Sequence, residues 1–190
     1  MATQTAPDTV LQQRFWNRWN SETREQSLNE ISLRQQREIL GWLAELGRRD
    51  LDIVDIGCGA GWLEAHLLPF GRVTATDLSD EVLARAAMRV PGARFVAGDI
   101  MSLSLGSACF DVAVSLEVLS HVADQPGFLK RVARLLRPGG HLMLATQNRP
   151  ILELNRIPPP PPGQLRKWVD SDELRALLEP DFEPLRIYTV

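Results

Sequence analysis

The sequence predicts an α/β fold with a doubly wound, mostly parallel sheet and helices on both of its faces. Two observations lead to this prediction. From residue 51 onward, short apolar runs of strand character alternate with amphipathic segments of helical period. The first of these runs breaks into a glycine-rich turn at Gly57–Gly61, and a helix-like segment follows. Crossovers in such a sheet are right-handed, so a ligand is expected at the carboxyl ends of the strands.

The sequence indicates where the elements of this pattern begin and end. Ser79 is expected to cap the helix after the second strand, and Asp124 to open the helix after the fourth. The Arg-Pro-Gly-Gly run at 137–140 is expected to end that helix. Asp170 and Glu173 have capping-box spacing at the start of a last helix. Five apolar runs are expected to be strands: 52–57, 72–77, 93–98, 110–116 and 141–146.

The first fifty residues stand apart from this alternation. We expect a helical arm or lid at 1–50, followed by the ligand-binding domain at 51–190. Ser27 and Glu30 have capping-box spacing before a helical apolar pattern. The aromatic segment 15–20 precedes them, and it either fixes the arm to the core or closes as a lid that excludes water.

Composition excludes several classes of protein. The chain has 190 residues, 44% of them hydrophobic, with a net charge of −3 and a pI of about 5.7, so no basic surface suggests nucleic acid. No apolar run approaches the roughly twenty residues that span a bilayer, and the polar N-terminus is no signal peptide. Cys58 and Cys109 form neither a metal site nor a disulfide framework. We therefore expect a cytoplasmic protein without a metal, nucleic-acid or membrane partner.

The turn and the acids around it predict a nucleoside site. Asp77 ends the second strand, where a carboxylate can accept hydrogen bonds from ribose hydroxyls. A dinucleotide fingerprint would need glycine at position 62, which is Trp62. Asp55, two residues before the first glycine, would repel a pyrophosphate and attract an ammonium or sulfonium group. The pattern therefore favours a cationic nucleoside without phosphate.

With this motif the chain resembles the class I S-adenosylmethionine (SAM)-dependent methyltransferases, which have a Rossmann-like fold. The resemblance implies that SAM is the cofactor and S-adenosylhomocysteine (SAH) the product. It also implies that Asp99 binds the exocyclic amine of adenine between apolar walls. The cofactor-binding residues predicted on this basis are Asp55, Gly57, Cys58, Gly59, Gly61, Asp77, Leu78, Asp99, Ile100, Met101 and Glu117.

The segment after the fourth strand bears on the acceptor. Glu117-Val-Leu-Ser-His121-Val resembles the corresponding segment of small-molecule methyltransferases, including the ubiquinone-biosynthesis O-methyltransferases. We therefore expect a small-molecule acceptor, methylated at a hydroxyl oxygen. Such an acceptor must lose a proton, and His121 is the histidine placed to take it. The alternative for His121 is a structural histidine, and we interpret His66 and His141 as structural.

The resemblance also sets an expectation for the C-terminal part. Residues 185–190 read as one more strand, whereas the class I fold ordinarily has two after the last helix, with the final one antiparallel. That final strand is expected to be missing, so the chain is either truncated or completed at its sheet edge by another chain. The run Pro158–Pro162 is expected to be a stiff surface connector, with a recognition site for a partner as the alternative.

Two other functions remain open at this point. One is an NAD-type oxidoreductase, which Trp62 and Asp55 disfavour. The other is a catalytically inactive SAM-binding protein, because the binding motif does not by itself require a reaction. Calorimetry with SAM, SAH and NAD would separate these classes.

Overall fold

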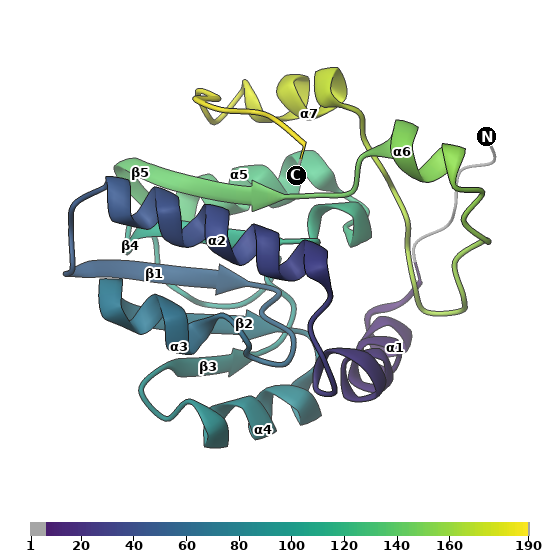
Figure 1. The fold of residues 1–190 in the computed structure, drawn as a ribbon, viewed down its shortest axis with the longest axis horizontal. Coiled ribbons are helices and arrows are strands. Elements are labelled where there is room, and N and C mark those ends of the chain that lie inside the picture. The colour runs from purple at the N-terminus through teal and green to yellow at the C-terminus, as the bar shows by residue number, and fades with distance from the viewer. Residues whose placement is uncertain (1–6, 190) are drawn as a thin grey trace.

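The computed structural model describes residues 7–189 and contains one sheet (Figure 1). Within that part of the chain all five strands are parallel, in the order β3-β2-β1-β4-β5. The chain order reverses between β1 and β4, which is the switch point where ligands bind in such sheets. The predicted doubly wound α/β fold is therefore confirmed. The strands are β1 Leu51–Ile56, β2 Gly71–Asp77, β3 Arg94–Ala97, β4 Phe110–Leu116 and β5 Leu136–Ala145.

Helices surround this sheet. Two apolar clusters form the core on its opposite faces, because successive side chains of β1 point to opposite sides. Val54 packs with Phe128 of α5, and Ile53 packs with Ile39 of α2. Helix α2 thus belongs to the same core as the sheet. The helices are α1 Thr9–Trp19, a π-turn η1 Asn20–Arg24, α2 Glu30–Glu45, α3 Glu64–Leu67, η2 Leu68–Phe70, α4 Asp80–Arg89, η3 Leu119–His121, α5 Gln125–Leu135, α6 Arg149–Leu154 and α7 Ser171–Leu178.

The helix caps predicted from the sequence agree in part with those in the structure. The Asp124 side chain accepts a hydrogen bond from the Gly127 amide, and Asp170 forms a capping box with Glu173, as expected. Ser79 does precede α4, but its hydroxyl accepts from Asn20 and makes no cap hydrogen bond. The capping box expected from Ser27 is wrong. Asn29 caps α2 instead, through hydrogen bonds from the amide and hydroxyl of Ser32.

The helix before the 137–140 run does end there, at Leu135, but two strand predictions in the C-terminal half are wrong. The strand expected at 141–146 begins earlier, as β5 Leu136–Ala145, so it contains the 137–140 run, and it pairs with β4 through an irregular register. Residues 185–189 form no strand, and Val190 lies outside the described residues, as do residues 1–6. Instead this segment is held against α2, where Arg186 pairs with Glu45 at 2.8 Å. In the part of the chain that the structure covers, no helix has the length and apolar character needed to cross a membrane.

Candidate functional site

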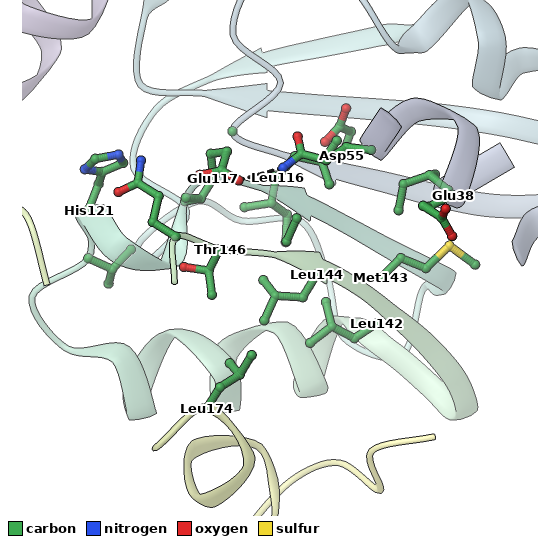
Figure 2. A pocket seen from close by; sticks show the side chains of 18 of the residues that line it. Glu38, Asp55, Leu116, Glu117, His121, Leu142, Met143, Leu144, Thr146 and Leu174 are labelled. Atoms are coloured by element: carbon green, nitrogen blue, oxygen red, sulfur yellow. Dashed lines mark hydrogen bonds between the residues drawn. The ribbon is translucent and has the colours of Figure 1, made fainter. Parts of the chain in front are cut away.

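A cavity of about 1240 Å³ opens at the carboxyl ends of the strands and continues along β5. Figure 2 shows Glu117, His121 and Thr146 around one end of it, and Leu142 and Leu144 farther along β5. Such a volume is large enough for a nucleoside cofactor and a second small molecule. The cavity wall includes these residues of the predicted site: Asp55, Gly57, Cys58, Gly59, Asp77, Leu78, Asp99, Ile100, Glu117 and His121.

The glycine turn has the left-handed backbone that its sequence predicts. Gly57 and Gly59 have φ values of +77° and +56°, a conformation that other residues adopt at a cost. The amides of Gly57 and Cys58 both donate to the carbonyl of Thr76, at 2.7 and 3.0 Å, which ties the turn to the end of β2. A Cβ atom on Gly57 would lie 2.1 Å from Val118 Cγ2. The turn therefore has no space for a side chain at this position.

Asp77 organises the ribose side of the turn. Its Oδ2 accepts from the Gly59 amide at 2.7 Å, and its Oδ1 accepts from the Ser79 amide at 2.7 Å. Each carboxylate oxygen has a second acceptor site, so both can still accept from hydroxyl groups. Asp77 thus both fixes the conformation of the turn and faces the cavity.

Two buried acids lie behind the turn. Asp55 is 3% exposed and Glu64, at the start of α3, is fully buried with no hydrogen-bond partner for its side-chain oxygens. Burial, together with the negative charges of Glu64 and Asp77, raises the pKa of Asp55 well above its ordinary value. Burial raises the pKa of Glu64 to about 7. An anion at the turn would disfavour the ionised form of both acids, whereas a cation there would favour it. Sequence reasoning missed Glu64, although its place in the first helical turn after the glycines was a usable signal.

The residues predicted around adenine divide into two groups. Asp99, Ile100 and Leu78 line the cavity, and Asp99 Oδ1 accepts from the amide of Met101 at 2.9 Å. The Met101 side chain is exposed and is not part of the cavity wall. Gly61 is also outside the wall, and a Cβ atom there would lie 2.7 Å from Cβ of Ala86. Its role is the close packing of α4 against the turn.

Glu117 follows β4 in a strained conformation. Its φ is +63°, which is uncommon for a residue other than glycine and points to a functional constraint. Its amide donates to the Ala145 carbonyl at 2.9 Å, and its Oε1 accepts from Gln35 of α2 at 2.7 Å. Burial raises the pKa of Glu117, while the Gln35 hydrogen bond and the charge of Arg24 act in the opposite direction.

His121 ends η3 and faces the same cavity. Its Nδ1 lies 2.6 Å from the carbonyl oxygen of Leu165. Because a carbonyl can only accept, Nδ1 carries the proton and Nε2 is left as the basic nitrogen. The ring of Trp16 packs edge-on at a centroid distance of 4.7 Å. Burial lowers the pKa of His121, so the ring is neutral near pH 7.

The other two histidines lie elsewhere. His66 is on the exposed side of α3. His141 lies within β5, opposite Val112 of β4, and lines the distant part of the cavity. Neither follows the carboxyl end of a strand, unlike His121.

The N-terminal segment covers the cavity. Trp16 and Trp19 of α1 and Asn20 and Arg24 of η1 line it, on the side of the glycine turn and the acids. Asn20 is 4% exposed, and its Nδ2 donates to Ser79 Oγ at 2.9 Å. Sequence reasoning noted the aromatic residues here but missed Asn20 and Arg24.

Comparisons with known proteins agree with this geometry. Residues 54–144 match a family described as a methyltransferase domain. A ubiquinone biosynthesis O-methyltransferase of Caulobacter sp. (strain K31) is 35% identical over 145 residues, covering 67% of this chain and 57% of that protein. A probable S-adenosylmethionine-dependent methyltransferase of Mycobacterium tuberculosis (strain CDC 1551 / Oshkosh) is 33% identical over 128 residues, covering 67% of this chain and 46% of that protein. The chain thus spans about half the length of these two curated relatives.

A solved structure extends the likeness to most of the chain. The 1,6-didemethyltoxoflavin-N1-methyltransferase of Burkholderia thailandensis, crystallised with 1,6-didemethyltoxoflavin and SAH, is 25% identical. It superposes with a TM-score of 0.72 over 95% of this chain and 81% of its own. The fold is that of a class I SAM-dependent methyltransferase. The chain carries a domain of this family, whose cofactor is SAM.

Proposed function

We propose that the protein transfers a methyl group from SAM to a hydroxyl oxygen of a small molecule. One observation carries the proposal: the basic nitrogen of a neutral, buried histidine and the acid-rich glycine turn belong to one cavity. The similarity to the Caulobacter ubiquinone biosynthesis O-methyltransferase supports oxygen as the acceptor atom.

The residues of the turn fit SAM by charge and by shape. Asp77 is placed to bind the ribose, while Leu78, Asp99 and Ile100 would surround adenine. Asp55, behind the turn, would be ionised next to the ammonium and sulfonium charges of the cofactor, because a nearby cation favours its carboxylate form. SAM supplies an electrophilic methyl group when it is bound, so the protein has mainly to orient the acceptor and exclude water.

His121 is the proposed general base. Its Nδ1–H, fixed on the Leu165 carbonyl, sets the tautomer in which Nε2 accepts the hydroxyl proton of the acceptor. The packed ring of Trp16 holds the imidazole in place and keeps water away from it. Glu117 is proposed as a cofactor-binding residue. Because it directly follows β4, it also lies in the part of the cavity where His121 would meet the acceptor.

The other proposals concern the whole molecule. Within the arm expected at 1–50, the segment before α2 would close the cavity, because Trp16, Trp19 and Asn20 line it. The protein would act in the cytoplasm on a small-molecule acceptor. A nucleic-acid partner is disfavoured, since the net charge of the chain is −3. An NAD-type function is disfavoured, because Glu64 occupies the start of the short α3 where a pyrophosphate would bind.

An acceptor screen tests this function. The protein is incubated with SAM and phenols, amines or sugars in turn, and release of SAH is measured. Turnover with a hydroxylated acceptor that is lost in His121→Ala supports the proposal. Turnover with amines alone would move the acceptor atom to nitrogen, and SAH binding without turnover of any acceptor would favour an inactive SAM-binding protein.

A further inference from the structure

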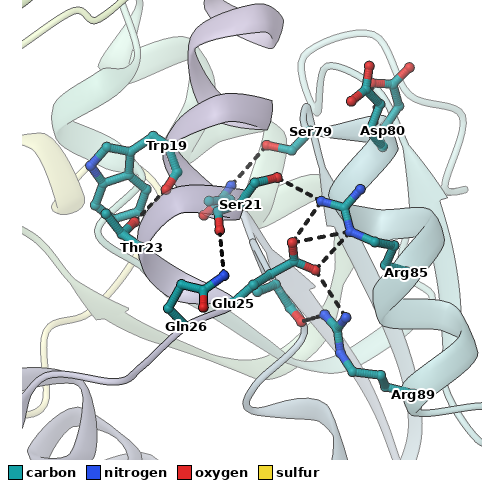
Figure 3. Close-up of polar contacts among 12 residues, drawn as sticks. Trp19, Ser21, Thr23, Glu25, Gln26, Ser79, Asp80, Arg85 and Arg89 are labelled. Carbon is teal, nitrogen blue, oxygen red and sulfur yellow. Dashed lines mark hydrogen bonds and ion pairs between the residues drawn. The ribbon is translucent and has the colours of Figure 1, made fainter.

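One carboxylate of the N-terminal segment, that of Glu25, binds two arginines of α4 (Figure 3). Glu25, directly after η1, accepts from Nε and Nη2 of Arg85 at 3.0 and 2.7 Å, and from Nη1 of Arg89 at 3.0 Å. The two arginines are four residues apart, so they lie on the same face of α4. The Glu25 side chain is only 13% exposed, but those of Arg85 and Arg89 are 39% and 46% exposed, so salt can still weaken these pairs.

This cluster reaches the cofactor turn directly. The second nitrogen of Arg89, Nη2, donates to the carbonyl of Ala60 at 2.7 Å. Ala60 lies inside the glycine turn, between Gly59 and Gly61. The planar guanidinium thus bridges a carboxylate of the N-terminal segment and the backbone of the turn.

The cluster also holds the segment that covers the turn. Arg85 Nη2 donates to Ser21 Oγ at 2.7 Å, and the Glu25 amide donates to the Asn20 carbonyl at 2.9 Å, which closes the π-turn. Asn20 Oδ1 in turn lies 3.1 Å from the place that a Cβ atom on Gly59 would take. Both ends of η1 are therefore fixed over the turn by contacts with α4.

We infer that Glu25 is a positioning residue for the cofactor site. With Arg85 and Arg89 it forms an ionic clasp that keeps η1 closed over the glycine turn and keeps the turn in its binding shape. The identity of the ligand rests on the proposed function, whereas the effect of the clasp on the turn does not. A ligand under η1 leaves when the clasp opens, so the clasp sets the rate of SAH release.

The chain offers a matched control for Glu25. Asp52, at the start of β1, also binds two arginines, Arg72 at 2.7 Å and Arg137 at 2.8 Å, and its side chain is 18% exposed. It lies at the amino end of the sheet, opposite the cofactor turn. Glu25→Gln and Asp52→Asn therefore remove similar ion pairs at opposite ends of the strands.

Hydrogen exchange in the ligand-free protein gives the first measurement. Peptides that contain residues 57–61 are expected to exchange about tenfold faster in Glu25→Gln than in the parent, because the turn opens more often. The same peptides in Asp52→Asn should exchange as in the parent. Equal exchange of the turn in the two variants would overturn the inference, whatever the ligand is.

Dissociation of SAH gives the second measurement. Release is expected to be about tenfold faster in Glu25→Gln, and to respond to salt between about 0.05 M and about 0.5 M in the parent but little in the variant. Arg89→Lys keeps the charge but cannot bridge Glu25 and the Ala60 carbonyl, so we expect a rate of SAH release between those of the parent and Glu25→Gln. If Glu25→Gln does not fold, Arg89→Lys is the variant that tests the inference. Parent-like release and salt response in these variants would contradict the clasp. If the parent itself does not bind SAH, the proposed function fails, and the exchange of the turn still decides the positioning role.

Discussion

At the scale of single residues, Asp77 has two tasks. It holds the Gly59 and Ser79 amides, and its remaining acceptor sites face the cavity. We expect Asp77→Ala to weaken SAH binding by about 1.5–3 kcal/mol, because hydrogen bonds to a charged acceptor are lost. Titration calorimetry measures this. Undiminished affinity would mean that the ribose does not lie at the end of β2.

The pH dependence of turnover tests His121. Burial lowers its pKa from the ordinary 6.5, so the base loses its proton at a lower pH than a free imidazole. The pH–rate profile is therefore expected to rise on a limb below pH 6.5 and to be flat around pH 7–8. His121→Ala should lower turnover by about 10²–10⁴-fold and remove that limb, while SAH affinity stays near that of the parent. Unchanged turnover would leave positioning alone as the mechanism.

At the scale of elements, the strand-turn-helix unit depends on two different properties of glycine. Gly57 and Gly47 both have positive φ, +77° and +66°, so alanine strains the backbone at either position. Only at Gly57 would the new Cβ atom meet another side chain, Val118, whereas it has open space at Gly47. Gly57→Ala should therefore weaken SAH binding at least about tenfold more than Gly47→Ala, which costs only about 1–2 kcal/mol of stability. Equal SAH affinities in the two variants would show that the turn tolerates a side chain.

Element prediction from sequence succeeded where the determining contacts are local. The Asp170–Glu173 capping box joins residues three apart, and it was predicted correctly. The strand expected at 185–190 had the right apolar character, but the segment instead contacts α2 through Arg186 and Tyr188, which local pattern cannot reveal. The Glu25 clasp and the Asn20–Ser79 hydrogen bond also escaped prediction, because local pattern does not reveal contacts between distant residues. Asn20 and Ser79 are 59 positions apart. The glycine turn and the acids Asp55 and Asp77 were predicted because they lie in two short sequence stretches, whereas Glu64 was missed.

At the scale of the whole molecule, the buried acids make stability depend on pH. Glu64 has a pKa of about 7 in the folded protein and 4.5 when unfolded, so the folded state keeps this carboxyl protonated up to a higher pH. Between these values the free energy of unfolding falls as pH rises. We expect Glu64→Gln to raise the melting temperature at pH 8 more than at pH 5. Thermal unfolding at the two pH values measures this.

Asp52→Asn provides a control of opposite sign. Hydrogen bonds from Arg72 and Arg137 lower the pKa of Asp52, so its ionised form stabilises the fold at pH 8 and this stability is lost as pH falls below about 4. Asp52→Asn should therefore lower the melting temperature at pH 8. A Glu64→Gln variant with the same shift at both pH values would show that the Glu64 carboxyl is not protonated in the fold.

The central claim is that the cavity at the carboxyl ends of the strands binds a cationic, phosphate-free nucleoside. Calorimetric titration of the purified chain with SAM, SAH and NAD tests it most directly. The glycine turn, the Asp77 carboxylate that faces the cavity, and Trp62 in place of a glycine predict micromolar or tighter binding of SAM and SAH and no measurable binding of NAD. Tight binding of NAD together with no response to SAH would contradict the account.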